Sequence, residues 1–250
     1  MASLVTSHVE TAAPDFWDGV YTKTSYSREL SDGVKQAVQD AVAYFGDLKG
    51  KTVVDVGCGA GATSLLLAQM GAQVIALDTS EVALEALRER CRQLGLDNVR
   101  TQQCGALAID RIGPCDFAFG SMILHHIEPF GEFCAALKRT LKPGGKAFFF
   151  ENNAASDLLI WFRSHVVGKF WVPKYCDPYE FPLTPAEIRL LGQHCKVHTT
   201  YPNMYFLELV ATYLLRGHGE KLFRSFDAWL YRHKIGLRYS YNQYVFIENA

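Results

Sequence analysis

The sequence lacks several features that would point to whole classes of protein. Its 250 residues include 25 basic and 26 acidic side chains, a net charge of −1, which excludes the broad basic surface that nucleic-acid binding needs. The longest apolar stretch, residues 204–215, is interrupted by Glu208 and falls short of the roughly 20 apolar residues that a spanning helix requires. Early acidic residues, Asp15 and Asp18, replace a basic-then-apolar leader, so we expect no secretion signal.

Cysteine pairs and internal repeats are also missing. The seven cysteines stand at positions 58, 91, 104, 115, 134, 176 and 195, with no Cys-x-x-Cys pair and no spacing typical of zinc. Buried free thiols in a reducing compartment are the simplest interpretation, so we expect a cytoplasmic location and no structural metal.

What the sequence does contain is an alternation of short β-branched runs with helical runs between residues 51 and 151. The expected strands are 52–56, 73–77, 99–103, 117–120 and 146–151, and the expected helices between them are 62–69, 80–94 and 130–141. This order predicts an α/β fold with a Rossmann-like, doubly wound parallel sheet. Right-handed crossovers then bring the carboxyl ends of the strands to one edge, where ligands bind.

The flanking parts have a different character. Residues 1–50 are predicted to form an irregular aromatic arm followed by a helix over 30–45, and residues 152–250 hold much of the aromatic content. An aromatic, partly helical insertion at 158–179 follows the fifth strand. A helix from Thr184 and two strand-like pieces near 196–201 and 241–248 come after it. We interpret residues 152–250 as a substrate lid and the C-terminal part of the same domain.

The most informative stretch is Val53-Val54-Asp55-Val56-Gly57-Cys58-Gly59-Ala60-Gly61-Ala62. A buried strand contains the acid, and three alternating glycines follow it. Glycines let the backbone turn sharply, and they let a ligand approach without a Cβ in the way. Asp78 ends the next strand, where a carboxylate can accept two hydrogen bonds from a ribose diol.

Two ligands are compatible with this loop. Gly57-x-Gly59-x-x-Ala62 satisfies the dinucleotide fingerprint, but the third glycine comes two residues after the second, not three. Asp55 stands where it would repel a pyrophosphate and suit an ammonium. A Leu-Lys-Pro-Gly-Gly run at 141–145 introduces the fifth strand, and it also points away from NAD.

Together, Asp55-x-Gly57-x-Gly59-x-Gly61, Asp78 and the Leu-Lys-Pro-Gly-Gly run resemble the class I S-adenosylmethionine-dependent methyltransferases. The resemblance is closest to the small-molecule branch that includes ubiquinone/menaquinone methyltransferases and natural-product O-methyltransferases. It is specific over residues 51–151. It implies S-adenosylmethionine as cofactor and a seven-stranded sheet that ends in a C-terminal antiparallel hairpin.

The resemblance also implies roles for individual residues around the cofactor. Gly57, Gly59 and Gly61 would lie under its methionine part, Asp55 would serve the loop and the amino group, and Asp78 would bind the ribose. Further cofactor contacts are implied for Thr79 beside the adenine, for Ser121 beside the methionine part, and for Tyr21 on the N-terminal arm, residues 1–50, which would act as a cofactor lid.

One position departs from the family pattern. The family often has Gly-Asp-Ala after the third strand, with the Asp holding the adenine amine, and here the stretch is Cys104-Gly105-Ala106. The adenine would then depend on backbone groups at Gly105 and on Ala106 and Leu107, or Asp110 would substitute from further along the chain. We therefore expect weaker cofactor binding than the family pattern provides.

The chemistry of a hydroxyl acceptor needs a base, since its proton must be removed. The fourth strand is followed by Leu124-His125-His126, and Glu151 ends the fifth strand. In sugar and natural-product O-methyltransferases, a His in this context looks like the general base and a following carboxylate orients it. The resemblance therefore implies His125 as base and Glu151 as its partner, with His126 as the alternative and packing or capping as the structural reading of either His.

Four residues are candidates for the acceptor pocket. Trp161, His165, Trp171 and Tyr175 in the aromatic insertion are candidates for a hydrophobic substrate pocket, and they are equally suited to a core between lid and sheet. The Asn/Asp-Pro-Pro-Tyr motif of amide and nucleobase methylation is missing after the fourth strand. No acidic cluster suggests a magnesium site, so we expect no metal.

Three functions are compatible with these residues. The first is methyl transfer from S-adenosylmethionine to a small, partly hydrophobic metabolite, most readily at oxygen. The second is a non-methylating cyclisation that releases methylthioadenosine from the same cofactor. The third is a non-catalytic, methyltransferase-like binding subunit. We expect a small-molecule substrate, no nucleic acid, no membrane span, and a monomer or homodimer.

Overall fold

The computed structural model describes most of the chain. The described residues are 14–23, 30–155, 160–161, 182–204, 206–216 and 218–250. Most of the aromatic insertion expected at 158–179 lies outside them.

A seven-stranded sheet forms the centre of the molecule, in the order β3-β2-β1-β4-β5-β7-β6. The first five strands are parallel where they pair, and β7 runs antiparallel to both β5 and β6. The strands are β1 (Thr52–Val56), β2 (Gln73–Asp78), β3 (Val99–Gln103), β4 (Cys115–Ser121), β5 (Leu141–Asn152), β6 (Lys196–Thr200) and β7 (Asn242–Glu248). This is the Rossmann-like sheet with a C-terminal antiparallel hairpin that the sequence predicted.

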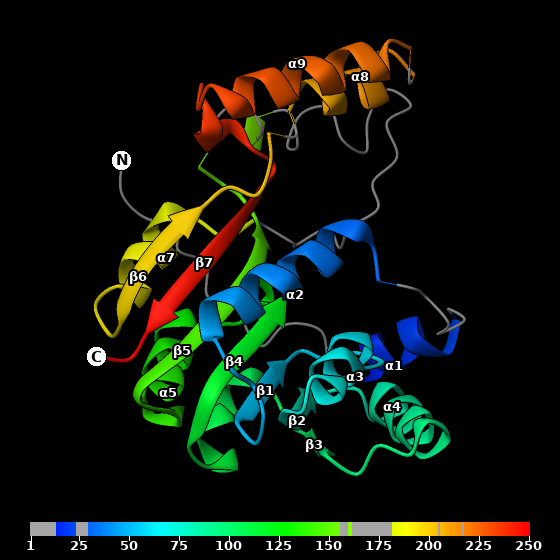
Figure 1. The fold of residues 1–250 in the computed structure, drawn as a ribbon, viewed down its shortest axis with the longest axis vertical. Coiled ribbons are helices and arrows are strands. Elements are labelled where there is room, and N and C mark those ends of the chain that lie inside the picture. Colours follow the sequence, from blue (N-terminus) through cyan, green and yellow to red (C-terminus); the bar gives the residue numbers. More distant parts are fainter. Residues whose placement is uncertain (1–13, 24–29, 156–159, 162–181, 205, 217) are drawn as a thin grey trace.

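Helices cover the sheet and its carboxyl edge (Figure 1). The α-helices are α1 (Pro14–Lys23), α2 (Asp32–Phe45), α3 (Ala62–Gln69), α4 (Glu81–Leu94), α5 (Phe130–Thr140), α7 (Pro185–Leu191), α8 (Leu207–Leu214) and α9 (Glu220–Arg232). Short 3-10 turns are η1 (Ala106–Ile112), η2 (Leu124–His126) and η3 (Leu237–Tyr239). In Figure 1, β4 and β5 point toward the end of the molecule that carries α8 and α9.

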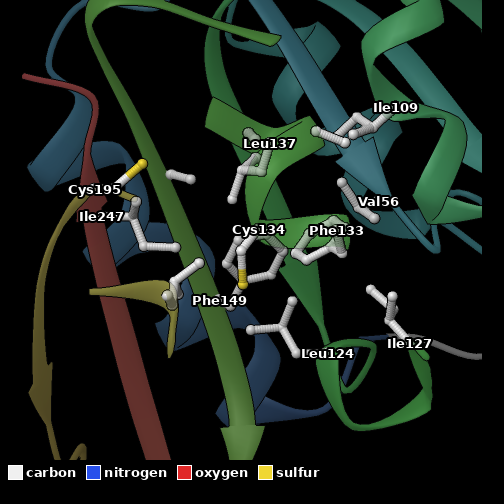
Figure 2. Packing of buried hydrophobic residues seen from close by; sticks show 14 of the residues in the cluster. Val56, Ile109, Leu124, Ile127, Phe133, Cys134, Leu137, Phe149, Cys195 and Ile247 are labelled. Carbon is white, nitrogen blue, oxygen red and sulfur yellow. The ribbon is translucent and has the colours of Figure 1, made fainter. Parts of the chain in front are cut away.

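Alternate residues of the buried strands pack into two hydrophobic cores, one on each face of the sheet. Along β4, Phe117 and Phe119 belong to the cluster that includes α2 residues such as Phe45, because successive strand side chains point to opposite faces. Ala118 belongs to the other cluster, where Phe133 of α5 lies edge-on to Phe149 of β5 with the ring centroids 6.2 Å apart. Figure 2 shows this second cluster packed between α5 and the sheet.

Local signals explain where several helices begin. Ser80, the expected N-cap of α4, accepts the Ala83 amide on its side chain. Thr184, the N-cap of α7, and Glu187 in the first turn of the helix form a capping box, because each side chain accepts a backbone amide that the helix leaves without a partner.

Two expectations about element boundaries were wrong. The N-terminal arm was predicted to be irregular up to residue 30, but α1 forms there, held by long-range contacts described below. The fifth strand was expected to begin at Lys146 after a Pro-Gly-Gly stop. It begins instead at Leu141, directly after α5, and its register against β4 shifts between Cys115 and Phe117. Extra residues in β5 are absorbed as a bulge.

Among the described residues, no helix has the length and hydrophobicity needed to cross a membrane.

Candidate active site

The candidate site lies at the carboxyl ends of the parallel strands. Because β1 and β4 are neighbours in the sheet, the glycine loop that follows Val56 and the turn that follows Ser121 leave the same edge side by side. Ser121 ends β4 as the sequence predicted. The edge therefore brings the expected cofactor residues close to the expected catalytic ones.

The glycine loop adopts a conformation that other residues rarely reach. Gly57, Gly59 and Gly61 have φ values of 67°, 52° and 75°, in the left-handed region that glycine occupies without strain. A Cβ added at Gly57 would come within 2.6 Å of Ile123, and one at Gly61 would collide with Leu87. The loop is shaped by close packing on both sides, so glycine is required at these positions.

Asp55 is fully buried beneath the loop. Its Oδ2 accepts hydrogen bonds of 2.6 Å from the hydroxyls of Thr63 and Ser64 in the first turn of α3. Burial raises the pKa of Asp55 to about 6, despite the lowering by these two hydroxyls, and the nearby Asp78 adds to the rise. A buried acid whose charged form is disfavoured gains from the arrival of a cation.

Asp78 joins the loop to α4. Its Oδ2 accepts the Gly59 amide at 2.8 Å and its Oδ1 accepts the Ser80 amide at 2.9 Å. Burial raises the pKa of Asp78, and the backbone hydrogen bonds partly oppose the rise. Each carboxylate oxygen has a second lone-pair direction, so both retain capacity for a diol.

The expected adenine side of the site follows β2 and β3. The Thr79 carbonyl accepts the Gln103 side-chain amide at 3.2 Å, and a Cβ added at Gly105 would meet only the Thr79 methyl, at 3.9 Å. Ala106 and Leu107 begin η1 directly after it. Asp110, the expected substitute acid, instead forms an ion pair of 2.6 Å with Arg139 at the surface, which argues against that alternative.

His125 and Glu151 meet at the other half of the edge. The His125 Nδ1 lies 2.6 Å from Glu151 Oε2, and both side chains are buried. Glu151 Oε1 accepts the backbone amides of Ile123 and Leu124 at 2.8 and 2.7 Å. Met122, with φ 55°, makes the preceding turn in the left-handed region, which non-glycine residues seldom adopt and which is common at functional sites.

His126 lies beside this pair. Its ring centroid is 4.1 Å from that of His125 and 5.5 Å from that of Trp17 on α1, which meets it edge-on. The aromatic arm therefore reaches the predicted catalytic residues, a contact that the sequence did not indicate.

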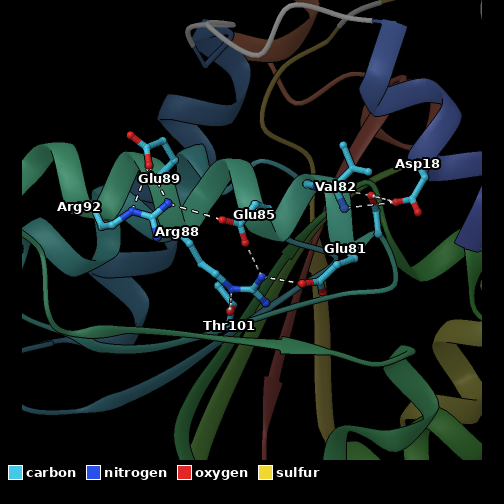
Figure 3. Close-up of polar contacts among 10 residues, drawn as sticks. Asp18, Glu81, Val82, Glu85, Arg88, Glu89, Arg92 and Thr101 are labelled. Carbon is cyan, nitrogen blue, oxygen red and sulfur yellow. Dashed lines mark hydrogen bonds and ion pairs between the residues drawn. The ribbon is translucent and has the colours of Figure 1, made fainter.

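The rest of α1 contacts the part of the edge that holds the glycine loop, Asp55 and Asp78, which we call the cofactor half. Asp18 Oδ1 accepts the Ser80 hydroxyl at 2.5 Å and the Val82 amide at 3.4 Å, at the start of α4 (Figure 3). The Tyr21 hydroxyl lies directly over Gly59, where a Cβ would collide with it. Asp18 is thus a site residue that sequence reasoning missed, because its partners are more than sixty residues away and no local pattern marks it.

The expected substrate residues are mostly outside the described chain. His165, Trp171 and Tyr175 lie there, and Trp161 has 54% of its surface exposed. Their pocket role stays a prediction. In the described ranges, no group of three or more His, Cys, Asp or Glu side chains is arranged to hold a metal ion.

Comparison with known proteins identifies the central part of the chain. Residues 53–145 match the family model of a methyltransferase domain. Ubiquinone biosynthesis O-methyltransferases from Idiomarina loihiensis and Caulobacter vibrioides are 34% and 30% identical over 148 and 145 residues, each match covering 56% of this chain. The matches span 59% and 57% of those relatives. The chain therefore matches little more than half the length of these curated relatives.

Solved structures share the fold over nearly the whole chain. An S-adenosylmethionine-dependent methyltransferase from Aquifex aeolicus matches with a TM-score of 0.58 at 19% identity, covering 93% of this chain and 98% of its own. The magnesium protoporphyrin IX methyltransferase from Synechocystis PCC 6803, solved with bound S-adenosylhomocysteine, matches with a TM-score of 0.59 at 17% identity, covering 94% and 93%.

The residues at the edge fit S-adenosylmethionine. Asp78 retains acceptor capacity for a ribose diol, and the charged form of Asp55 gains from a nearby ammonium. Residues 53–145 therefore carry a methyltransferase domain, set in a fold that S-adenosylmethionine-dependent methyltransferases share, and S-adenosylmethionine is the cofactor that this domain uses.

Proposed function

We propose that this protein transfers a methyl group from S-adenosylmethionine to a hydroxyl oxygen of a small, partly hydrophobic metabolite, with His125 as general base. The observation that carries the proposal is the 2.6 Å contact between His125 Nδ1 and Glu151 Oε2 at the carboxyl edge of the sheet. The relatives named above act in ubiquinone biosynthesis as O-methyltransferases, which supports oxygen as the accepting atom.

The partners of Glu151 support one tautomer of the base. Its two oxygens face the backbone amides of Ile123 and Leu124 and the imidazole of His125. The two amides donate to Oε1, and in this proposal Oε2 accepts the hydrogen that His125 Nδ1 carries. Nε2 is then the unprotonated nitrogen, which accepts the proton of the substrate hydroxyl.

The order of the strands places this base beside the methyl donor. S-adenosylmethionine, when bound, supplies a methyl group made electrophilic by its sulfonium. Asp55 and the glycine loop at the end of β1 hold its methionine part, and β4 delivers Ser121 and the turn to His125 on the adjacent strand. Methyl transfer mainly needs the two reactants aligned, and adjacent strands supply that alignment.

The flanking segments complete the site in this proposal. Residues 1–50 act as a cofactor lid, because Trp17 covers His126 and Tyr21 covers Gly59. Residues 152–250 supply the acceptor pocket, with Trp161, His165, Trp171 and Tyr175 as its candidate walls. Both segments exclude water from the edge. We propose a cytoplasmic location and a monomer or homodimer.

Mass spectrometry of the purified protein with S-adenosylmethionine and a metabolite extract tests the proposal. We expect S-adenosylhomocysteine together with a product heavier by one methylene unit, and strong loss of both in the His125→Ala variant. His194→Ala, which changes a histidine outside the edge, is the matched control. Methylthioadenosine without a methylated product would establish the cyclisation alternative, and no cofactor turnover with any extract would favour a binding subunit.

A further inference from the structure

The helix α9 is attached to the molecule by a single face. Asp227 is its one buried residue. The Asp227 carboxylate accepts the amides of Phe206, Leu207 and Glu208 at the start of α8, at 2.9–3.1 Å. These charge-assisted bonds fix the orientation of α9, so the side chains that it turns away from α8 are held in place.

A stripe of large apolar side chains runs along the outward face of α9. Leu222, Phe226 and Trp229 follow helical spacing, so they share one face, and they are 73%, 51% and 44% exposed. The rings of Phe226 and Trp229 stack with centroids 5.5 Å apart. We call these three residues the apolar stripe. Their exposure to water is energetically unfavourable.

The region around the apolar stripe is strongly basic. Residues 215–239 contain six Lys or Arg and two acids, a charge of +4, so the remainder of the chain carries −5 against the total of −1. Arg224 pairs with Glu220 at 2.6 Å and also with Glu208 of α8 at 2.6 Å, and the other acid of the segment is the buried Asp227.

Two cations border the stripe directly. Lys221 and Arg232 are eleven positions apart, three helical turns, so they lie on one line beside it. Both are exposed, and neither pairs with an acidic side chain of the described chain.

We propose that α9 docks this protein onto an anionic lipid surface, lying in the plane of the interface with the apolar stripe buried among the acyl chains. An exposed apolar stripe beside basic side chains is the pattern of interfacial helices, and anionic headgroups attract such cations. A second copy is disfavoured as occupant, because a two-fold contact would bring two basic surfaces together.

Docking has a consequence for the site at the carboxyl edge. Since β4 and β5 point toward the end of the molecule that carries α8 and α9 (Figure 1), a bilayer on α9 lies at the end where the candidate site opens. A partly hydrophobic acceptor can then pass between bilayer and site. The docking itself does not depend on methyl transfer and is tested without it.

Sedimentation with sucrose-loaded vesicles tests the docking. We expect the full chain to sediment with vesicles of equimolar phosphatidylcholine and phosphatidylglycerol, to bind phosphatidylcholine alone much less, and to be released by salt. The double variant Phe226→Ser/Trp229→Ser should lower partitioning by about tenfold or more. Leu94→Ser, which removes a 52% exposed leucine from α4, is the matched control and should change nothing.

A charge variant and a fluorescence measurement separate docking from misfolding. Lys221→Glu/Arg232→Glu keeps the apolar stripe and should abolish the preference for anionic vesicles. Brominated lipids should quench the parental protein more than Trp229→Phe. The proposal is overturned if the parental chain ignores the mixed vesicles, if the double variant binds as the parent does, or if the stripe instead mediates a dimer that Phe226→Ser/Trp229→Ser dissolves.

Discussion

Each half of the carboxyl edge contains a buried carboxylate, and the two carboxylates differ in their hydrogen-bond partners. In the cofactor half, Asp55 is buried at the end of β1, and hydroxyls of Thr63 and Ser64 hold it. In the other half, Glu151 is buried at the end of β5, and two backbone amides and the His125 ring hold it. Both carboxylates lie in the interior, but only Glu151 accepts two backbone amides on one oxygen.

The difference lies in what the partners of each carboxylate can do. Side-chain hydroxyls can rotate to donate or accept, so Asp55 tolerates either protonation state, and burial raises its pKa to about 6. Backbone amides can only donate, so Glu151 is held as an acceptor. In the proposed function, a cation near Asp55 favours the charged form of this acid, and Glu151 orients His125 as base.

The largest effect is expected from Glu151→Gln. The amide side chain keeps the volume and can still accept from Ile123 and Leu124, but its NH2 group faces His125 Nδ1 and forces the wrong tautomer. We predict a fall of about 10²- to 10⁴-fold in methyl transfer, measured as methylated product once the acceptor is identified. Cofactor affinity, measured by calorimetry, should stay within about twofold of the parent. An equal loss of both would mean that the two halves are not separable.

The next largest effect concerns pH and Asp55. Its folded-state pKa of about 6 lies above the ordinary 3.8, so the native state retains the proton longer than the unfolded chain does. Its contribution to stability is therefore present below pH 3.8 and is lost as the pH rises through about 6, a change of roughly 3 kcal/mol. Urea unfolding of Asp55→Asn across this window should show a flatter pH dependence. Part of the dependence of unfolding free energy on pH should remain in the variant, because the pKa of Asp78 is raised as well. An unchanged pH dependence would show that Asp55 does not titrate in this window.

Asp78→Asn should weaken the cofactor half alone. The variant keeps one acceptor for the Gly59 or Ser80 amide and loses the charged acceptor for the ribose diol, a loss of roughly 1.5–3 kcal/mol. Calorimetry should show about 10- to 100-fold weaker binding of S-adenosylhomocysteine. Asp47→Asn changes an exposed carboxylate before β1 and should leave the affinity at the parental value. Parental affinity in Asp78→Asn would remove the ribose assignment.

The smallest effect is a gain. Gly105 has ordinary extended backbone angles and open space around an added Cβ, so Gly105→Asp fits without strain. A carboxylate there can accept from the adenine amine and should tighten cofactor binding by up to about tenfold. Gly105→Ala, which adds the Cβ without the acid, separates packing from hydrogen bonding. If both variants bind equally, the adenine lies elsewhere.

Much of the cofactor half could be predicted from sequence because its determinants are local. The strand residues 52–56, the glycines and Asp78 lie within one strand-helix-strand unit, and Asp55 finds its partners eight and nine residues away. Periodicity and turn chemistry carry such information directly.

The contacts of α1 and the start of β5 could not be predicted in this way. Asp18 binds Ser80 across 62 positions, so no local pattern in the sequence indicates the contact. The Pro-Gly-Gly run at 143–145 suggested a break. The neighbouring strand β7 instead continues the pairing, with the Gly144 amide donating to the Asn249 carbonyl, and tertiary pairing outweighs local propensity.

The separability of the two halves is tested most directly by single turnover from methyl-labelled S-adenosylmethionine, with Glu151→Gln and Asp78→Asn compared at a saturating cofactor concentration. The account predicts that saturation restores transfer in Asp78→Asn, because only binding is impaired, and leaves Glu151→Gln slow, because its base is misoriented. Transfer at the parental rate in Glu151→Gln would contradict it.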